Sequence, residues 1–133
     1  MKGKLLHEEI TDKILFSFFS VNKVIDRGIE TDFYRNALAV EFKHNNLTFQ
    51  RNFPVQLEYR GEKIGELLAE FLIEKKVLVK VVDQEVIDMI AERGAKLLLK
   101  NSEIEICLVL NAAGENDFKR VFLSNEYKKR TTD

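Results

Sequence analysis

The sequence of 133 residues contains one cysteine, one proline, no tryptophan and no long hydrophobic run. Cys107 cannot form an internal disulfide by itself, so a secreted fold held together by disulfides is not expected. Its apolar neighbours in the chain predict that the thiol is buried. No uninterrupted apolar stretch approaches the roughly 18 residues that a membrane-spanning helix needs. The first residues carry charges where an export signal has its apolar segment, so we expect a cytoplasmic protein without membrane association.

An excess of one charge sign is also missing. Lysine and arginine total 21 and aspartate and glutamate total 22, which gives a net charge of −1. A nearly neutral chain does not attract nucleic acid through its overall charge. The composition, 45% hydrophobic and 32% charged, is that of an ordinary globular protein, and the length suits one domain. We predict a single domain over 1–125 and a mobile polar tail over 126–133.

Hydrophobic spacing predicts the order of the secondary-structure elements. In chain order we predict helices over 4–26 and 32–45, strands over 49–59, 64–74 and 76–82, a helix over 84–100, and strands over 104–110 and 118–123. Thr31 is the expected N-cap of the second helix, and Pro54 indicates an edge strand or a bulge. The order α-α-β-β-β-α-β-β predicts an α/β fold with a mixed β-sheet flanked by helices.

The first helix has an apolar surface wider than one face of a helix normally buries. Ile14 lies on one stripe at helical spacing, and a second set that includes Leu15, Phe18 and Phe19 widens it. Large exposed apolar patches usually mark interfaces between chains. We therefore predict a homodimer in which these four side chains form the interface.

Several short segments of the chain carry a resemblance to a known family. They are LHEEIT (6–11), FYRNALAVE (33–41), FQR (49–51), YRGEKIG (59–65) and LN (110–111). In this order and spacing the sequence resembles the GxxExxR family of small bacterial proteins, which is classed within the PD-(D/E)xK nuclease-like superfamily. The resemblance implies a PD-(D/E)xK nuclease-like core with the element order given above.

The resemblance also implies a particular kind of active site. In the superfamily an Asp on the second strand and a Glu on the third hold a divalent metal, and a Glu on an early helix often completes the site. Two hard oxygen ligands are about the minimum for holding Mg²⁺ beside a phosphate. A Lys two residues after the second acid offsets the charge that develops during phosphoryl transfer.

This sequence departs from the family pattern at almost every reactive position. The early-helix Glu falls on Thr31, the strand Asp on Glu70, the metal-binding Glu on Lys80 and the catalytic Lys on Val82. An ammonium in the place of a ligand is incompatible with a two-carboxylate metal site. We predict a catalytically inactive binding or assembly module without a cofactor, in which Glu70 and Lys80 form an ion pair across neighbouring strands.

Two alternatives remain open at this point. In the first, the protein is a nuclease that uses Mg²⁺ or Mn²⁺ at a displaced site, with Lys80 acting beside carboxylates such as Asp83, Glu85 or Glu30. That site requires three carboxylates that converge. In the second, the protein binds nucleic acid without cleaving it, and Lys75 and Lys76 are the candidate contacts.

Overall fold

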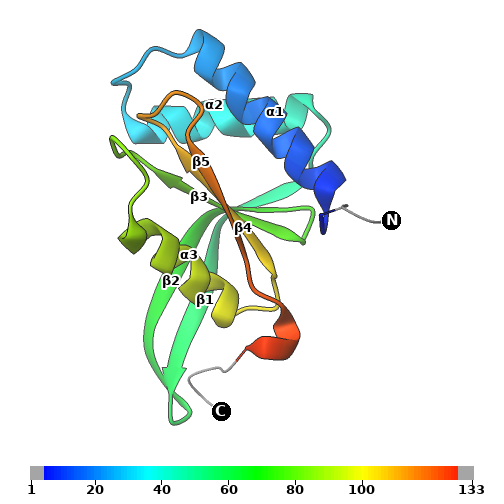
Figure 1. The fold of residues 1–133 in the computed structure, drawn as a ribbon, viewed down its shortest axis with the longest axis vertical. Coiled ribbons are helices and arrows are strands. Elements are labelled where there is room, and N and C mark those ends of the chain that lie inside the picture. The colour runs from blue at the N-terminus through cyan, green and yellow to red at the C-terminus, as the bar shows by residue number, and fades with distance from the viewer. Residues whose placement is uncertain (1–4, 129–133) are drawn as a thin grey trace.

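The structure is a computed structural model that describes residues 5–128. Its elements are α1 (Glu8–Val24), α2 (Thr31–His44), β1 (Phe49–Tyr59), β2 (Glu62–Ile73), β3 (Val77–Val82), α3 (Met89–Lys100), β4 (Ile106–Asn111), β5 (Phe118–Phe122) and the 3₁₀ turn η1 (Asn125–Tyr127). The helices lie on both sides of the sheet, with α1 and α2 on one side and α3 on the other (Figure 1). The predicted α/β class and element order are confirmed.

The five strands form one mixed sheet in the order β1-β2-β3-β4-β5. β3 and β4 are parallel and joined through α3, whereas the other neighbours are antiparallel. β3 is the central strand and is almost entirely buried, as its run of β-branched residues predicts. Pro54 lies in β1, which is an edge strand, so its missing N–H does not interrupt the centre of the sheet.

The wide apolar surface of α1 is used within the chain. Ile14 and Phe18 are fully buried in the core between the α1–α2 layer and the sheet. Leu15 and Phe19 are partly buried against the same core, and the Phe19 ring contacts that of Phe118 in β5 at 6.2 Å. These four side chains therefore pack within the chain, because the sheet and the neighbouring helix α2 cover this side of α1, and the dimer interface assigned to them stays a prediction.

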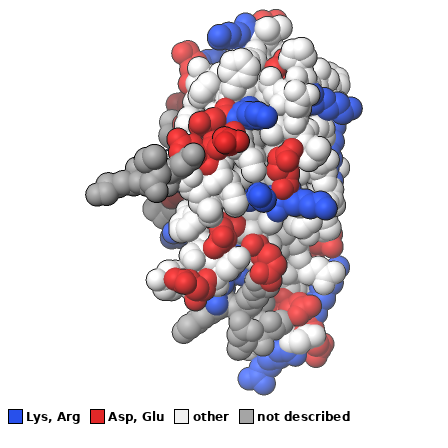
Figure 2. Space-filling view, turned by 90° about the vertical axis from the view of Figure 1, so that its right-hand side faces the viewer, with Lys and Arg blue, Asp and Glu red and all other residues white. Residues whose placement is uncertain are grey.

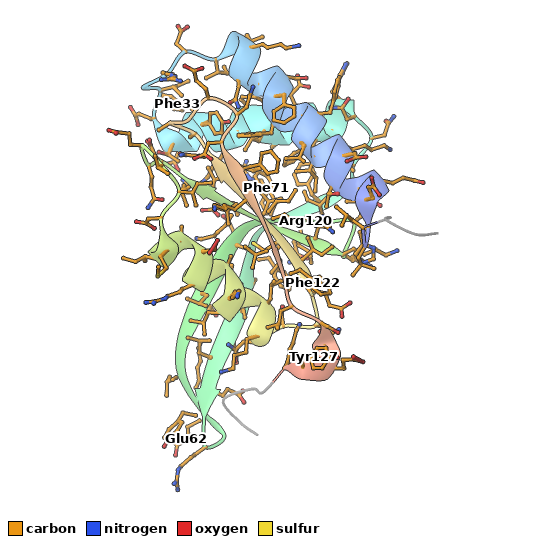
Figure 3. The ribbon with its side chains drawn as sticks, viewed as in Figure 1. Phe33, Glu62, Phe71, Arg120, Phe122 and Tyr127 are labelled. Atoms are coloured by element: carbon orange, nitrogen blue, oxygen red, sulfur yellow. The ribbon has the colours of Figure 1, made fainter. Side chains whose placement is uncertain are left out.

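Phe71 lies near the middle of this core (Figure 3). Its ring contacts those of Phe42 and Phe49 at 5.0 and 5.5 Å. The three rings join α2, β1 and β2 in edge-on arrangements that aromatic side chains prefer. The position of α2 over the first two strands is thereby fixed, and α2 carries several residues of the site described below.

The helix predicted from residue 84 begins later, at Met89. The preceding segment is held by side chains instead of helical hydrogen bonds, because the N–H of Gln84 donates to the buried Asn111 and that of Ile87 donates to Asp117. Asp88 then caps α3 by accepting the N–H of Ala91 at 2.9 Å. Val86, before the helix, and Ile90, in its first turn, are both exposed.

Partway along the β1–β2 hairpin, the odd-numbered side chains change from one face of the sheet to the other. Near the β2–β3 turn, Phe49 and Phe71 face α1 and α2, whereas Val55 and Ala69 face α3. All four positions are odd-numbered, and side chains two apart in a regular strand share one face. The change occurs at Asn52, whose φ of 56° is left-handed. Figure 1 shows the rest of the hairpin extending past the other strands, alongside α3.

The C-terminal segment is more ordered than predicted. Residues 125–127 form η1, and the Lys128 ammonium donates to the carbonyl oxygens of Ser102 and Ile104. The rest of the predicted tail, 129–133, lies outside the described residues. No helix within 5–128 combines the length and the apolar character needed to cross a membrane.

Cys107 is fully buried, as predicted, and burial raises the pKa of its thiol to about 12. A buried thiol with a high pKa reacts slowly because the thiolate is the nucleophile. We expect the native protein not to react with a disulfide reagent and the unfolded protein to react with one equivalent. Rapid labelling of the native protein would show that β4 opens readily.

Two neighbouring phenylalanines of α1 provide a test of the core. Phe18→Ala should lower the free energy of unfolding by about 3–5 kcal/mol because it leaves a cavity in a fully packed region. Phe16 is 62% exposed on the same helix, so Phe16→Ala should change the free energy of unfolding by no more than about 0.5 kcal/mol. Urea denaturation measures both, and equal losses would contradict the placement of α1.

Candidate functional site

Glu70 lies where β2 and β3 stop pairing. Their ladder runs from Ile73 and Val77 to Phe71 and Val79, and in the same register Glu70 is opposite Lys80. The two strands separate beyond this point. The backbone N–H of Val81, which has no partner in β2 there, donates instead to Glu70 Oε1 at 2.9 Å. A side chain thus replaces the strand-to-strand hydrogen bond at the gap.

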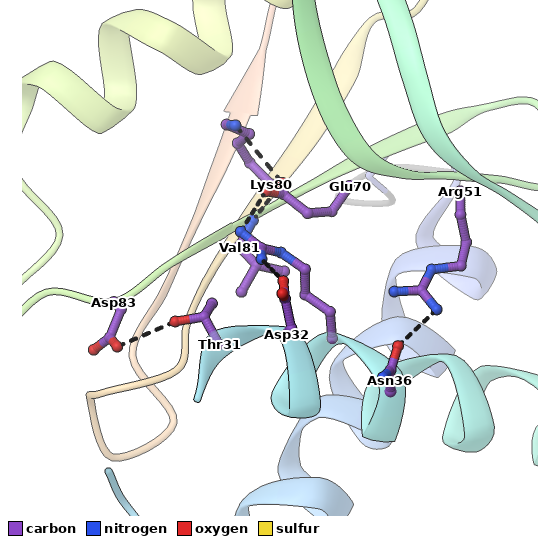
Figure 4. Close-up of polar contacts among 9 residues, drawn as sticks. Thr31, Asp32, Asn36, Arg51, Glu70, Lys80, Val81 and Asp83 are labelled. Carbon is purple, nitrogen blue, oxygen red and sulfur yellow. Dashed lines mark hydrogen bonds and ion pairs between the residues drawn. The ribbon is translucent and has the colours of Figure 1, made fainter. Parts of the chain in front are cut away.

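Two cations approach the same carboxylate. The Lys80 Nζ lies 3.7 Å from Glu70 Oε1 and donates to the carbonyl oxygen of Leu68 at 3.1 Å. From α2, the Arg35 guanidinium donates to Glu70 Oε2 at 3.1 Å and to Asp32 Oδ1 at 2.8 Å. Figure 4 shows Lys80 and Glu70 meeting above the start of α2. The predicted ion pair between Glu70 and Lys80 is confirmed, and Arg35 extends it to the helix layer.

This cluster is partly shielded from water. The side chains of Glu70, Arg35 and Lys80 are 12%, 27% and 32% exposed. Electrostatic interactions are stronger in such positions than on the open surface because water screens them less. The Glu70 carboxylate therefore has a backbone N–H, a guanidinium and an ammonium around it. These donors meet its hydrogen-bonding and charge requirements without any metal.

The other two predicted site positions lie apart from Glu70. Thr31 is the first residue of α2, and Glu30 occupies the cap position without a side-chain hydrogen bond, so the prediction of Thr31 as the N-cap is wrong. The Thr31 hydroxyl instead donates to Asp83 Oδ2 at 3.4 Å, at the far end of β3 (Figure 4). Val82 packs against the core on the α3 side. Neither residue contributes a charge to the cluster.

The described residues do not fit the divalent metal that the resemblance implies. Within 5–128, no three or more His, Cys, Asp or Glu side chains are grouped so that they could hold a metal ion. The displaced nuclease site requires converging carboxylates, and these residues do not form it. At Glu70 itself, two cations occupy the approaches that a metal would use.

The lysines considered as nucleic-acid contacts lie elsewhere. Lys75 and Lys76 are exposed at the β2–β3 turn. Lys75 and Lys80 are five residues apart along the chain, which corresponds to roughly 16 Å along an extended strand. On the face shown in Figure 2, basic side chains are scattered among acidic ones and form no continuous patch. A uniform basic surface of the kind that binds a phosphate backbone is not visible there.

Arg35 is the member of the cluster that sequence analysis missed. The signal was present, because Arg35, Leu38 and Phe42 follow the i, i+3, i+7 spacing of one helix face. Leu38 and Phe42 are fully buried. A cation on the buried face of an amphipathic helix requires a partner of opposite charge. The amide of Val81 carries no sequence signal, since it depends only on where the two strands separate.

The arrangement of layers and the acid in the gap between the second and third strands define a nuclease-like α/β domain. A comparison with models of protein families matches residues 8–121 to the PD-(D/E)XK nuclease superfamily. The chain therefore belongs to the PD-(D/E)XK nuclease superfamily. A search among curated proteins and a search among solved structures found no match.

A double-mutant cycle tests whether Arg35 and Glu70 stabilise the fold together. Combining Arg35→Met and Glu70→Gln should reveal a coupling free energy of about 1–3 kcal/mol, since the hydrogen bonds are charged and shielded. Arg27 and Glu115 form an exposed pair at 2.7 Å and serve as the control, with an expected coupling of about 0–1 kcal/mol. Chemical denaturation measures both cycles, and equal couplings would contradict the proposed shielding.

Proposed function

We propose that this protein is a catalytically inactive, GxxExxR-type member of the superfamily that acts as a binding or assembly module. The observation that carries the proposal is the environment of Glu70. Its carboxylate contacts Arg35, Lys80 and the Val81 amide, and Lys80 stands at the position where the family has its second metal-binding acid. A carboxylate that is paired with two cations is a poor ligand for Mg²⁺.

Catalysis by the superfamily depends on the metal and on a lysine two residues after the second acid. The corresponding residue here is Val82, which packs against the α3-side core and has no ionisable group. Without a metal at Glu70 and a lysine at position 82, the metal-assisted stabilisation that the superfamily gives to a transferring phosphoryl group is missing. The fold therefore supports recognition better than hydrolysis.

The nature of the partner stays a prediction. A homodimer remains a candidate, but the side of α1 that motivated it is buried within the chain. Binding to nucleic acid through Lys75 and Lys76 has less support, because the face shown in Figure 2 has no continuous basic patch. Sedimentation of the full chain, alone and with oligonucleotides, distinguishes these possibilities.

Activity is tested by comparing the wild-type protein with Glu70→Ala in a plasmid-nicking assay containing Mg²⁺ or Mn²⁺. We expect neither protein to nick plasmid above the background, and calorimetry to detect no binding of either metal to the wild type. If the wild type bound metal at micromolar affinity and Glu70→Ala abolished nicking, the protein would be an active nuclease and the proposal would be wrong.

A gain of metal binding provides the complementary test. Lys80→Glu places a second carboxylate opposite Glu70, where the two like charges repel each other unless a cation lies between them. We expect Mn²⁺ to raise the melting temperature of Lys80→Glu but not that of the wild type. Lys75→Glu changes the charge equally at the exposed β2–β3 turn and should behave like the wild type. An equal rise in both variants would indicate non-specific binding.

A further inference from the structure

A pocket of about 400 Å³ opens beside the Glu70 cluster, between α2 and the β1–β2 hairpin. Its polar lining comes from Asp32, Arg35, Asn36, Arg51, Asn52 and Glu70. Labelled side chains of this lining approach from two directions in Figure 4, with Asn36 on α2 and Arg51 on the facing strand. The pocket is larger than a phosphate group and open enough to admit a small molecule.

Both carboxylates of this pocket are already paired with cations. Asp32 and Glu70 each accept a hydrogen bond from Arg35, and Glu70 also accepts the Val81 N–H and lies 3.7 Å from the Lys80 ammonium. A carboxylate that is paired with a cation attracts a further cationic ligand less strongly. The donors of the lining are therefore the groups that a ligand could engage.

Several donors in the lining have no partner. The Arg35 Nε is buried and makes no hydrogen bond within 5–128. Arg51 donates from Nη1 to Asn36 Oδ1 at 2.9 Å, and its other N–H groups make no hydrogen bond within the described chain. The side-chain amide nitrogens of Asn36 and Asn52, two exposed residues, likewise have no acceptor within the described chain. Of these donors only the Arg35 Nε is buried, and a buried donor without a partner costs about 1–3 kcal/mol, so an acceptor at this nitrogen is favoured.

The donors are also held in position. The Arg51 guanidinium lies 5.4 Å from the centre of the Phe71 ring, and the hydrogen bond to Asn36 fixes its orientation. Asn52 has a left-handed φ of 56° in the middle of β1, a conformation that asparagine tolerates better than most residues. These constraints reduce the side-chain freedom that a ligand would otherwise have to remove.

We propose that this pocket binds the phosphate group of a small phosphate monoester. The donors come from α2 and from β1 and therefore converge from different directions, which suits a tetrahedral group with three terminal oxygens better than a planar carboxylate. The lining itself carries two cations, Arg35 and Arg51, and two anions, Asp32 and Glu70, so its charge is 2 − 2 = 0, and the Lys80 ammonium beside Glu70 adds one positive charge near the pocket. The inference goes beyond the proposed function, because it assigns a ligand to a site that needs no metal.

The test is an NMR titration of the full chain in the presence of EDTA, which separates this site from any metal binding at Glu70. The probes are inorganic phosphate, a nucleoside monophosphate and acetate. We expect both phosphates to shift the Arg35 Nε–H resonance and the backbone resonances of Asn36 and Asn52. Acetate should shift them only at much higher concentration. Equal binding of acetate and phosphate, or no shift at these residues, would overturn the proposal.

Two arginines provide a matched pair of variants. Arg51→Gln should weaken phosphate binding about tenfold, the effect of losing one charged hydrogen bond. Arg60 also lies over an aromatic ring, that of Tyr59 at 5.9 Å, but at the hairpin tip far from the pocket. Arg60→Gln should therefore leave binding within about twofold of the wild type, since it removes no pocket contact. Equal effects of the two substitutions would show that only the overall charge matters.

A competition experiment distinguishes binding of a phosphate monoester from binding of a nucleic-acid backbone. A short oligonucleotide with hydroxyls at both ends offers only phosphodiesters, and the same oligonucleotide with a terminal phosphate adds one monoester. We expect only the second to compete with the nucleoside monophosphate for the pocket. If both competed equally and Arg51→Gln weakened both, the pocket would bind nucleic-acid backbone and the monoester proposal would be wrong.

Discussion

The ion-paired carboxylate of Glu70 is the interaction on which the arrangement of this region depends. Glu70 lies in the gap between β2 and β3, and its contacts reach a backbone amide of β3 and the guanidinium of Arg35 on α2. One side chain therefore connects two strands and a helix. Because it replaces a missing ladder hydrogen bond, the sheet can open at this level without leaving buried backbone groups unpaired. The opening, in turn, makes room for the neighbouring pocket.

The same contacts determine which chemistry the region can support. In the superfamily this gap holds a metal between carboxylates, and here an ammonium and a guanidinium supply the positive charge instead. The fold can keep its shape when side-chain cations replace a metal ion, because either one neutralises the carboxylate at the position of Glu70. A side-chain cation has no open coordination position for an attacking water, whereas a bound metal has. Under the proposed function, the ion pairs at Glu70 keep the structure of this region without the metal that catalysis needs.

Much of the fold was predictable from local patterns, and what was not depended on tertiary contacts. The central strand and the edge strand with Pro54 follow from composition and spacing. The late start of α3 does not, because the segment before it is held by Asn111 and Asp117, distant in the sequence. The change of face at Asn52 is also hidden, since the apolar residues on either side of it, Phe49 and Phe53, keep the spacing of a single strand face. At the site, residue identities indicated the Glu70–Lys80 pair, but Arg35 required knowing which side of α2 faces the sheet.

The most direct test of the central claim is paramagnetic broadening by Mn²⁺ of the assigned amide resonances. If the cations of Arg35 and Lys80 occupy the approaches to Glu70, small amounts of Mn²⁺ should broaden exposed acidic positions weakly and leave the amides of Glu70 and Val81 sharp. Selective broadening of these two amides, ahead of every exposed acidic residue, would place a metal at Glu70 and contradict the account.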